Sequence, residues 1–212
     1  MHIPDGFLVV PVIAVTGLAS AGGLTVAVRV TGRKLKEKQV PLMGIMAAFI
    51  FAAQMLNVPV AGGTSGHVMG AAIAAILVGP WAAVIIMSVV LITQSLIFQD
   101  GGLLALGANI FNMGIVAPMV AYYFYRMLET VFSKSHLGRT LAGFGAAWIS
   151  VVLASLLCAL ELGVSGLAPF SAVIPAMLSV HAVIGVVEGG VTVAVLRLVM
   201  VARADILTQQ KV

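Results

Sequence analysis

The sequence predicts an all-α protein, a polytopic membrane bundle of seven transmembrane helices. Of its 212 residues, 61% are hydrophobic and 8% are charged, whereas about 25% of the residues in a soluble domain are charged. The mean hydropathy is +1.17. Apolar runs close to the ~20 residues that cross a bilayer recur along the whole chain. We therefore expect one integral-membrane domain over residues 1–212, in which residues 1–6 precede the first span.

Six apolar runs are long enough to span a membrane. They are Phe7–Val30, Pro41–Val58, Trp81–Phe98, Asn109–Tyr125, Thr140–Leu160 and Ala172–Val201. A shorter seventh run, His67–Gly79, is separated from the next one by Gly79-Pro80. Because proline breaks or kinks a helix, this region is either two helices joined by a tight turn or one long kinked helix.

The basic residues favour two helices there, and thus seven spans. With seven spans, every loop that carries lysine or arginine falls on one side of the membrane; a single kinked span would move the Arg126–Arg139 group to the other side. The eleven basic residues are Arg29, Arg33, Lys34, Lys36, Lys38, Arg126, Lys134, Arg139, Arg197, Arg203 and Lys211. The positive-inside rule then places the N-terminus outside, the C-terminus in the cytoplasm and the protein in the cytoplasmic membrane.

The remaining composition narrows the class of protein further. The net charge of +4 comes from scattered residues, not from the basic stripe with aromatics that binds nucleic acid. The single cysteine, Cys158, lies inside an apolar run, so we expect neither a disulfide framework nor a thiolate metal cluster.

The first two residues form a potential chelator. Met1–Gly6 contains no lysine or arginine and leads directly into a span, unlike a cleaved secretory signal. Because His2 is bulky, the initiator methionine should be retained with a free amine. The Met1 amine and the His2 amide nitrogen close a five-membered ring on a metal ion, and the His2 amide and imidazole Nδ1 close a six-membered ring.

Three nitrogens in one plane favour a square-planar ion. A deprotonated amide suits Ni(II) or Cu(II), with Co(II) possible and Zn, Mg or Ca disfavoured. The best fourth ligand is His67, which follows Gly62-Gly63-Thr64-Ser65-Gly66 on the predicted outer side. Taken singly, His2 could be a surface residue and His67 a hydrogen-bonded residue at a helix start.

Several polar residues are candidates for supporting this site. Asp5, Asn57, Ser65 and Asn109 lie near the predicted outer ends of the helices and could orient the ligands; simple interhelical hydrogen bonding, or a turn in the case of Asp5, is the alternative. His181 and Glu188 are seven residues apart and so share a helix face. They form either a relay or a structural pair.

The start Met1-His2-Ile3-Pro4-Asp5-Gly6-Phe7-Leu8, followed by Gly62–His67, resembles the CbiM/NikM family. These are the substrate-specific components of cobalt and nickel energy-coupling factor (ECF) transporters. The resemblance implies metal binding by Met1, His2 and His67, with Ni(II) or Co(II) as the transported substrate. It also implies a transmembrane coupling protein, paired ATP-binding subunits and a small auxiliary membrane subunit as partners.

Two other functions are alternatives to metal capture for an ATP-driven importer. A membrane-embedded metalloenzyme would need an open coordination position and a general base beside it. A stand-alone secondary transporter would show inverted repeats and broken helices at the midplane. The chain carries no G-x-x-x-x-G-K-[ST] phosphate loop, so ATP hydrolysis is expected in a partner. The choice between nickel and cobalt and the oligomeric state stay open.

Overall fold

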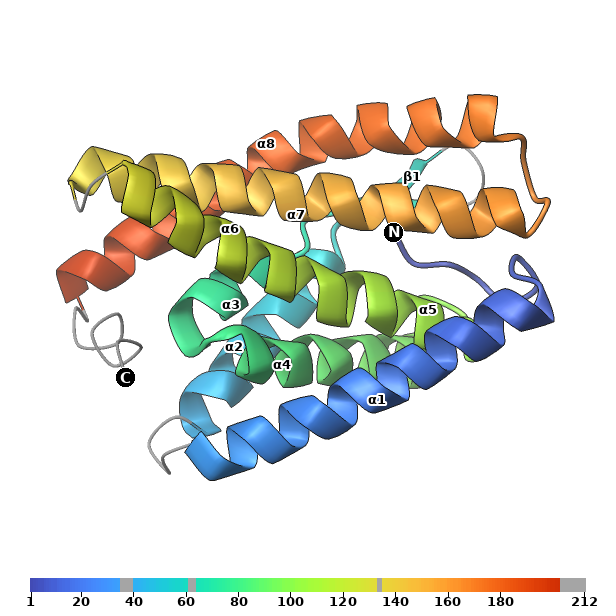
Figure 1. Ribbon diagram of the computed structural model, residues 1–212, viewed down its shortest axis with the longest axis horizontal. Coiled ribbons are helices and arrows are strands. Elements are labelled where there is room, and N and C mark those ends of the chain that lie inside the picture. Colours follow the sequence, from blue (N-terminus) through green and yellow to red (C-terminus); the bar gives the residue numbers. More distant parts are fainter. Residues whose placement is uncertain (35–39, 61–63, 133–134, 203–212) are drawn as a thin grey trace.

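The helices of the computed structural model, which describes residues 1–34, 40–60, 64–132 and 135–202, lie side by side in an elongated bundle (Figure 1). Helix α1 (Val10–Lys34) lies along one side of the bundle, and α7 (His136–Val164) and α8 (Phe170–Ala202) lie along the opposite side. The shorter α2 (Val40–Gln54) lies beside the interior helices.

Four helical stretches of the described chain are long and apolar enough to cross a membrane. They are Val10–Arg33, Pro80–Phe98, Leu137–Val164 and Phe170–Ala202. Large apolar side chains point outward from them: Leu18 of α1 is 76% exposed and Val183 of α8 is 68% exposed. An apolar outer surface of this extent belongs in lipid, which agrees with the predicted multi-pass membrane protein.

Two helices of the bundle contain π-helical turns. Helix α4 (Pro80–Thr93) continues as η2 (Gln94–Phe98), and α5 (Leu106–Asn109) continues through η3 (Ile110–Val116) into α6 (Ala117–Val131). π-helical turns are rare and frequently occur at functional sites. Gln94 and Asn109, which stand where these turns begin, are both buried.

The third predicted span has an unexpected form. An antiparallel hairpin, β1 (Asn57–Val60) and β2 (Thr64–His67), precedes it and pairs Asn57 with His67. The helix itself, α3 (Ala71–Val78), begins four residues after His67. Its eight residues extend about 12 Å, so α3 crosses only part of a bilayer. His67 therefore lies at the end of a strand, where a helix start was predicted.

Two separate helices are present at Gly79-Pro80, as the charge pattern predicted. Gly79 has φ 89° and Pro80 begins α4, which is the place where proline is tolerated because its missing N–H would be unpaired in any case. With α4–η2 and α5–η3–α6 each taken as one continuous helix, the described residues hold seven helical segments, in agreement with the predicted seven.

Basic residues gather at one end of the bundle. The ends of α1, α6 and α8 and the start of α7, which carry Arg33, Arg126, Arg197 and Arg139, lie together at the left of Figure 1. The hairpin lies toward the other end. This separation has the form that the positive-inside prediction requires. Some residues used in the sequence analysis lie outside the described part of the chain: Lys36, Lys38, Lys134, Arg203, Lys211, Gly62 and Gly63.

Candidate metal centre

The N-terminal segment is buried inside the protein. Met1, His2 and Ile3 are 1%, 3% and 0% exposed. Asn109 pairs with the backbone of Ile3 as a neighbouring strand would: Ile3 N–H donates to Asn109 Oδ1 at 2.8 Å, and Asn109 Nδ2 donates to the Ile3 carbonyl at 3.1 Å. Gly102 N–H donates to the same carbonyl at 2.9 Å. Because the backbone on both sides of Ile3 is fixed, the first two residues have a defined position.

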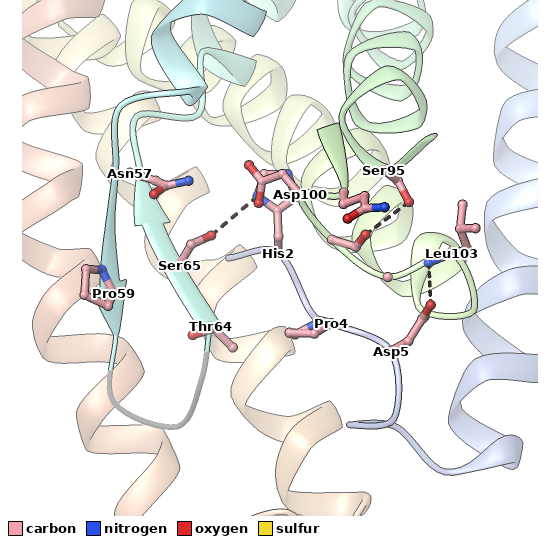
Figure 2. Close-up of a pocket in the computed structure, with 13 residues that line it drawn as sticks. His2, Pro4, Asp5, Asn57, Pro59, Thr64, Ser65, Ser95, Asp100 and Leu103 are labelled. Atoms are coloured by element: carbon pink, nitrogen blue, oxygen red, sulfur yellow. Dashed lines mark hydrogen bonds and ion pairs between the residues drawn. The ribbon is translucent and has the colours of Figure 1, made fainter. Parts of the chain in front are cut away.

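Asp5 anchors the loop that covers this segment. Its carboxylate accepts hydrogen bonds from the N–H groups of Leu103, Leu104 and Ala105 at 3.0, 2.7 and 3.2 Å. The adjacent Gly102 passes so close to Asp5 that a Cβ atom there would overlap the Asp5 carboxylate. Figure 2 shows the Asp5 side chain directed at Leu103. Asp5 is therefore a structural anchor that does not itself contact Met1 or His2 by hydrogen bonding.

The Met1 amine lies against the second strand of the hairpin. It donates to the Ser65 carbonyl and lies 3.3 Å from Ser65 Oγ. The Cys158 thiol is 3.9 Å from the Met1 carbonyl oxygen. Burial removes the amine from water and lowers its pKa to about 5, because desolvation disfavours the charged form. At neutral pH the amine is thus uncharged and has a lone pair available for a metal ion.

The His2 ring is fixed by Gln94. Gln94 Oε1 lies 3.0 Å from His2 Nε2; because an amide oxygen only accepts, the ring hydrogen is on Nε2 and Nδ1 carries the lone pair. Nδ1 lies 3.5 Å from Ser65 Oγ and 3.4 Å from Asp100 Oδ1. Burial is the main cause that lowers the His2 pKa to about 3. The neutral ring thus presents the nitrogen that the chelate requires.

The His67 ring presents its other nitrogen. Its Nδ1–H donates to the Val68 carbonyl at 3.0 Å, so Nε2 carries the lone pair. His67 is 2% exposed, and Nε2 has no hydrogen-bond partner among the described residues. A buried polar atom without a partner is uncommon and calls for an explanation. A metal ion at this position would supply the missing partner.

The two imidazoles are close enough to share one ion. Their ring centroids are 4.7 Å apart and their planes differ by 25°. With metal–nitrogen bonds of ~2 Å, two imidazoles bound at right angles to one ion have centroids about 4–5 Å apart. In the described part of the chain, no group of three or more His, Cys, Asp or Glu side chains could hold a metal. A site here therefore depends on main-chain nitrogens.

A cavity of about 570 Å³ leads to His2 and Ser65. Asp100 lies on its wall beside His2, and Figure 2 shows Asn57 on the hairpin next to it. Asn57 hydrogen-bonds the Asp100 carboxylate, whose pKa is raised chiefly by partial burial. His2 and Ser65 thus line the same cavity as the hairpin residues Asn57, Pro59 and Thr64.

The structure gives each predicted supporting residue a specific place. Ser65 contacts the Met1 amine, Asn109 holds Ile3 and Asp5 holds the covering loop. Asn57 pairs with His67 through the strand backbone, and its side chain hydrogen-bonds Asp100. Gln94 was only one of several polar residues inside predicted spans. Its role depends on a contact 92 positions away in the sequence, for which the local pattern carries no signal.

His181 and Glu188 share the buried face of α8, as their spacing predicted, and both are 0% exposed. They have different partners. His181 Nδ1 lies 2.8 Å from the Met177 carbonyl of its own helix. Glu188 accepts hydrogen bonds from the N–H groups of Met69 and Gly70, each at 2.7 Å.

The bundle, its lipid-facing surface and the paired histidines beside a buried amine define a multi-pass membrane protein with a candidate transition-metal site. The family described as CbiM, the cobalt uptake substrate-specific transmembrane region, matches residues 2–206. The chain belongs to this family, which confirms the resemblance. Its named members are metal transport proteins, and the cell membrane is their expected location.

Several relatives show the same assignment along nearly the whole chain. A provisionally named fused nickel transport protein, NikMN, of Archaeoglobus fulgidus is 42% identical, with the match covering 99% of this chain and 69% of the relative. The cobalt transport protein CbiM of Sorangium cellulosum is 30% identical, with coverage of 100% and 96%. A crystal structure of a truncated transition metal transporter superposes with a TM-score of 0.87 at 38% identity and covers 94% of this chain and 98% of that one.

Proposed function

We propose that this protein is the substrate-capturing component of an ECF-type metal importer. Four nitrogens bind the ion: the Met1 amine, the His2 amide, His2 Nδ1 and His67 Nε2. Residues 1–212 act as one membrane domain, with the N-terminus outside and the C-terminus in the cytoplasm. A coupling protein, paired ATP-binding subunits and a small auxiliary membrane subunit complete the importer.

One observation carries the proposal. The buried imidazoles of His2 and His67 have ring centroids 4.7 Å apart, and the lone pairs of His2 Nδ1 and His67 Nε2 are available to a metal ion. The uncharged, buried Met1 amine lies beside them. Nitrogen donors in a plane favour Ni(II) and Cu(II), followed by Co(II). The named relatives transport nickel or cobalt. We therefore propose Ni(II) as the substrate, with Co(II) as the second choice.

The four-nitrogen plane also argues against an enzyme. A catalytic metal needs an open coordination position for water or substrate, and here the fourth position is occupied by His67. The site is suited to binding the ion for transport and releasing it afterwards.

The decisive experiment adds two glycines before Met1 and compares this variant with a protein that carries the same two glycines at its C-terminus. Two are used because a single glycine would make histidine the third residue after the amine, which by itself forms a four-nitrogen chelate for Ni(II). The N-terminal glycines move the free amine two residues further from His2 and push against the buried Met1, so Ni(II) binding should be lost while the C-terminal variant binds normally. Binding is measured by equilibrium dialysis and absorption, with a yellow-orange diamagnetic complex expected. Unchanged binding after N-terminal extension would refute the role of the amine.

A further inference from the structure

Residues Val68–Gly70 connect the proposed ligand His67 to α3, and they fix the orientation of its ring. The Val68 carbonyl accepts the hydrogen bond from His67 Nδ1 at 3.0 Å. Gly70 has φ 77°, and a Cβ atom there would lie 2.7 Å from the Ile50 side chain. The segment thus has a conformation and a fit that only glycine allows at its end. Any movement of this backbone would turn the His67 ring.

Two helices hydrogen-bond this segment. From α8, the Glu188 carboxylate accepts the N–H groups of Met69 and Gly70, both at 2.7 Å. From α2, Gln54 Nε2 donates to the Met69 carbonyl at 2.7 Å. Glu188 and Gln54 are both 0% exposed. The two Glu188 oxygens each accept one of these N–H groups, whereas Gln54 makes a single bond, so Glu188 makes the larger contribution.

A buried carboxylate in a membrane bundle is expensive and is kept where it has a function. Glu188 satisfies the first N–H groups ahead of α3, where the helix dipole also favours negative charge. A serine or asparagine directly before α3 in the sequence would cap the helix without the free-energy cost of burying a carboxyl group. The cap is supplied instead from α8, 118 residues away, so the position of α8 is linked to the position of the segment.

We propose that Glu188 is a positioning residue for metal binding: it holds Val68–Gly70, and through Val68 the His67 ring, so that the fourth ligand depends on the position of α8. The inference rests on the proposed function, because it takes His67 as a ligand. Displacement of α8 would withdraw the carboxylate, free the segment and turn His67 away from the ion. The Met1 and His2 nitrogens would then hold the ion more weakly, which favours its release.

The test compares Glu188→Gln with Glu161→Gln in the purified full-length protein. Glu161 is a matched control, because its carboxylate accepts a 2.7 Å bond from Asn112 Nδ2 but does not contact the segment. In Glu188→Gln the amide oxygen can accept one N–H, while the amide hydrogens oppose the other. Ni(II) is loaded, and its dissociation into excess chelator and its visible absorption band are recorded.

We expect Glu188→Gln to speed Ni(II) dissociation by about tenfold to a hundredfold, the range for residues that orient a ligand. Its absorption band should shift toward that of His67→Ala, while Glu161→Gln matches the wild type. Gln54→Met removes the weaker bond to Met69 and should produce a smaller shift in the same direction, which provides a test if Glu188→Gln does not fold.

The inference is overturned if the folded Glu188→Gln protein keeps the wild-type band and dissociation rate, or if only its thermal stability falls. A faster dissociation at an unchanged band would also overturn it, since loss of negative charge alone would then explain the effect. These results leave the proposed function intact. By contrast, if His67→Ala itself keeps the wild-type band and affinity, the proposed function fails.

Discussion

Gln94 offers a quantitative test of the candidate site. Replacing it by methionine keeps the approximate length of the side chain but removes the oxygen that accepts from His2 Nε2 at 3.0 Å. The metal-bound form would then bury an unpaired Nε2–H, which costs about 1–3 kcal/mol. Alternatively, the ring hydrogen moves to Nδ1 and blocks the proposed ligand. Either way, the cost falls on the metal-bound state.

At 1.4 kcal/mol per tenfold change, this cost corresponds to a Kd for Ni(II) that is higher by about 5- to 150-fold. The range for groups that orient a metal-binding histidine, about 10- to 100-fold, lies inside it. The assay is competition with a chelator of known affinity at pH 7, followed by absorption. Gln94→Glu keeps an acceptor at the same place and serves as the control, with a Kd within about threefold of the wild type. A Gln94→Met protein that binds Ni(II) as tightly as the wild type would show that the Gln94 contact does not orient a ligand.

Three further results are expected. Gly102→Ala should displace the N-terminal segment and reduce Ni(II) affinity at least tenfold, roughly the effect of a lost orienting group. Gly22→Ala, with open space around it, should leave the affinity unchanged. Equal Ni(II) binding by the Gly102→Ala protein and the wild type in dialysis would contradict the close packing. Because the pKa of the Met1 amine is lowered to about 5, the amine is already deprotonated at pH 7, and binding should weaken as the pH falls through 5. Calorimetry in buffers of different ionisation enthalpy should therefore record about one proton released per Ni(II), from the His2 amide. Release of two protons would indicate that the amine is protonated before the ion binds. Asp100→Asn should slow Ni(II) association roughly three- to tenfold and reduce its salt dependence in stopped-flow measurements, since a carboxylate at the cavity wall attracts cations; an unchanged rate would exclude such steering.

Much of the candidate site could be predicted because it depends on covalent chemistry. The proposed chelate rings of Met1 and His2 follow from the order of atoms along the chain, and the membrane class follows from the long apolar runs. A short motif also predicts His67 as a ligand, but the prediction of a helix start at this residue is wrong. A hairpin of two four-residue strands has neither the length nor the hydrophobic period that identifies a span, so a helix start was expected at His67.

The residues that hold the ligands were harder to predict. Gln94 and Glu188 act on residues 92 and 118–119 positions away, and the sequence around each of them does not name these partners. Inside a membrane span, any polar residue suggests a buried partner, but the pattern does not say which one. Only the packing of α8 beside the hairpin and of η2 beside the N-terminal segment identifies these partners.

The contacts of the N-terminal segment also bear on the order in which the protein matures. Met1 is synthesised well before its partners, which lie far along the chain: Cys158, which contacts its carbonyl, is 157 positions away, and Asn109 is 106 positions from Ile3. Contacts between such distant residues require long loops to close and form late in folding. In a partly inserted chain the N-terminal segment therefore lacks the partners that hold it in place, and the proposed metal site would be complete only once the later helices have packed.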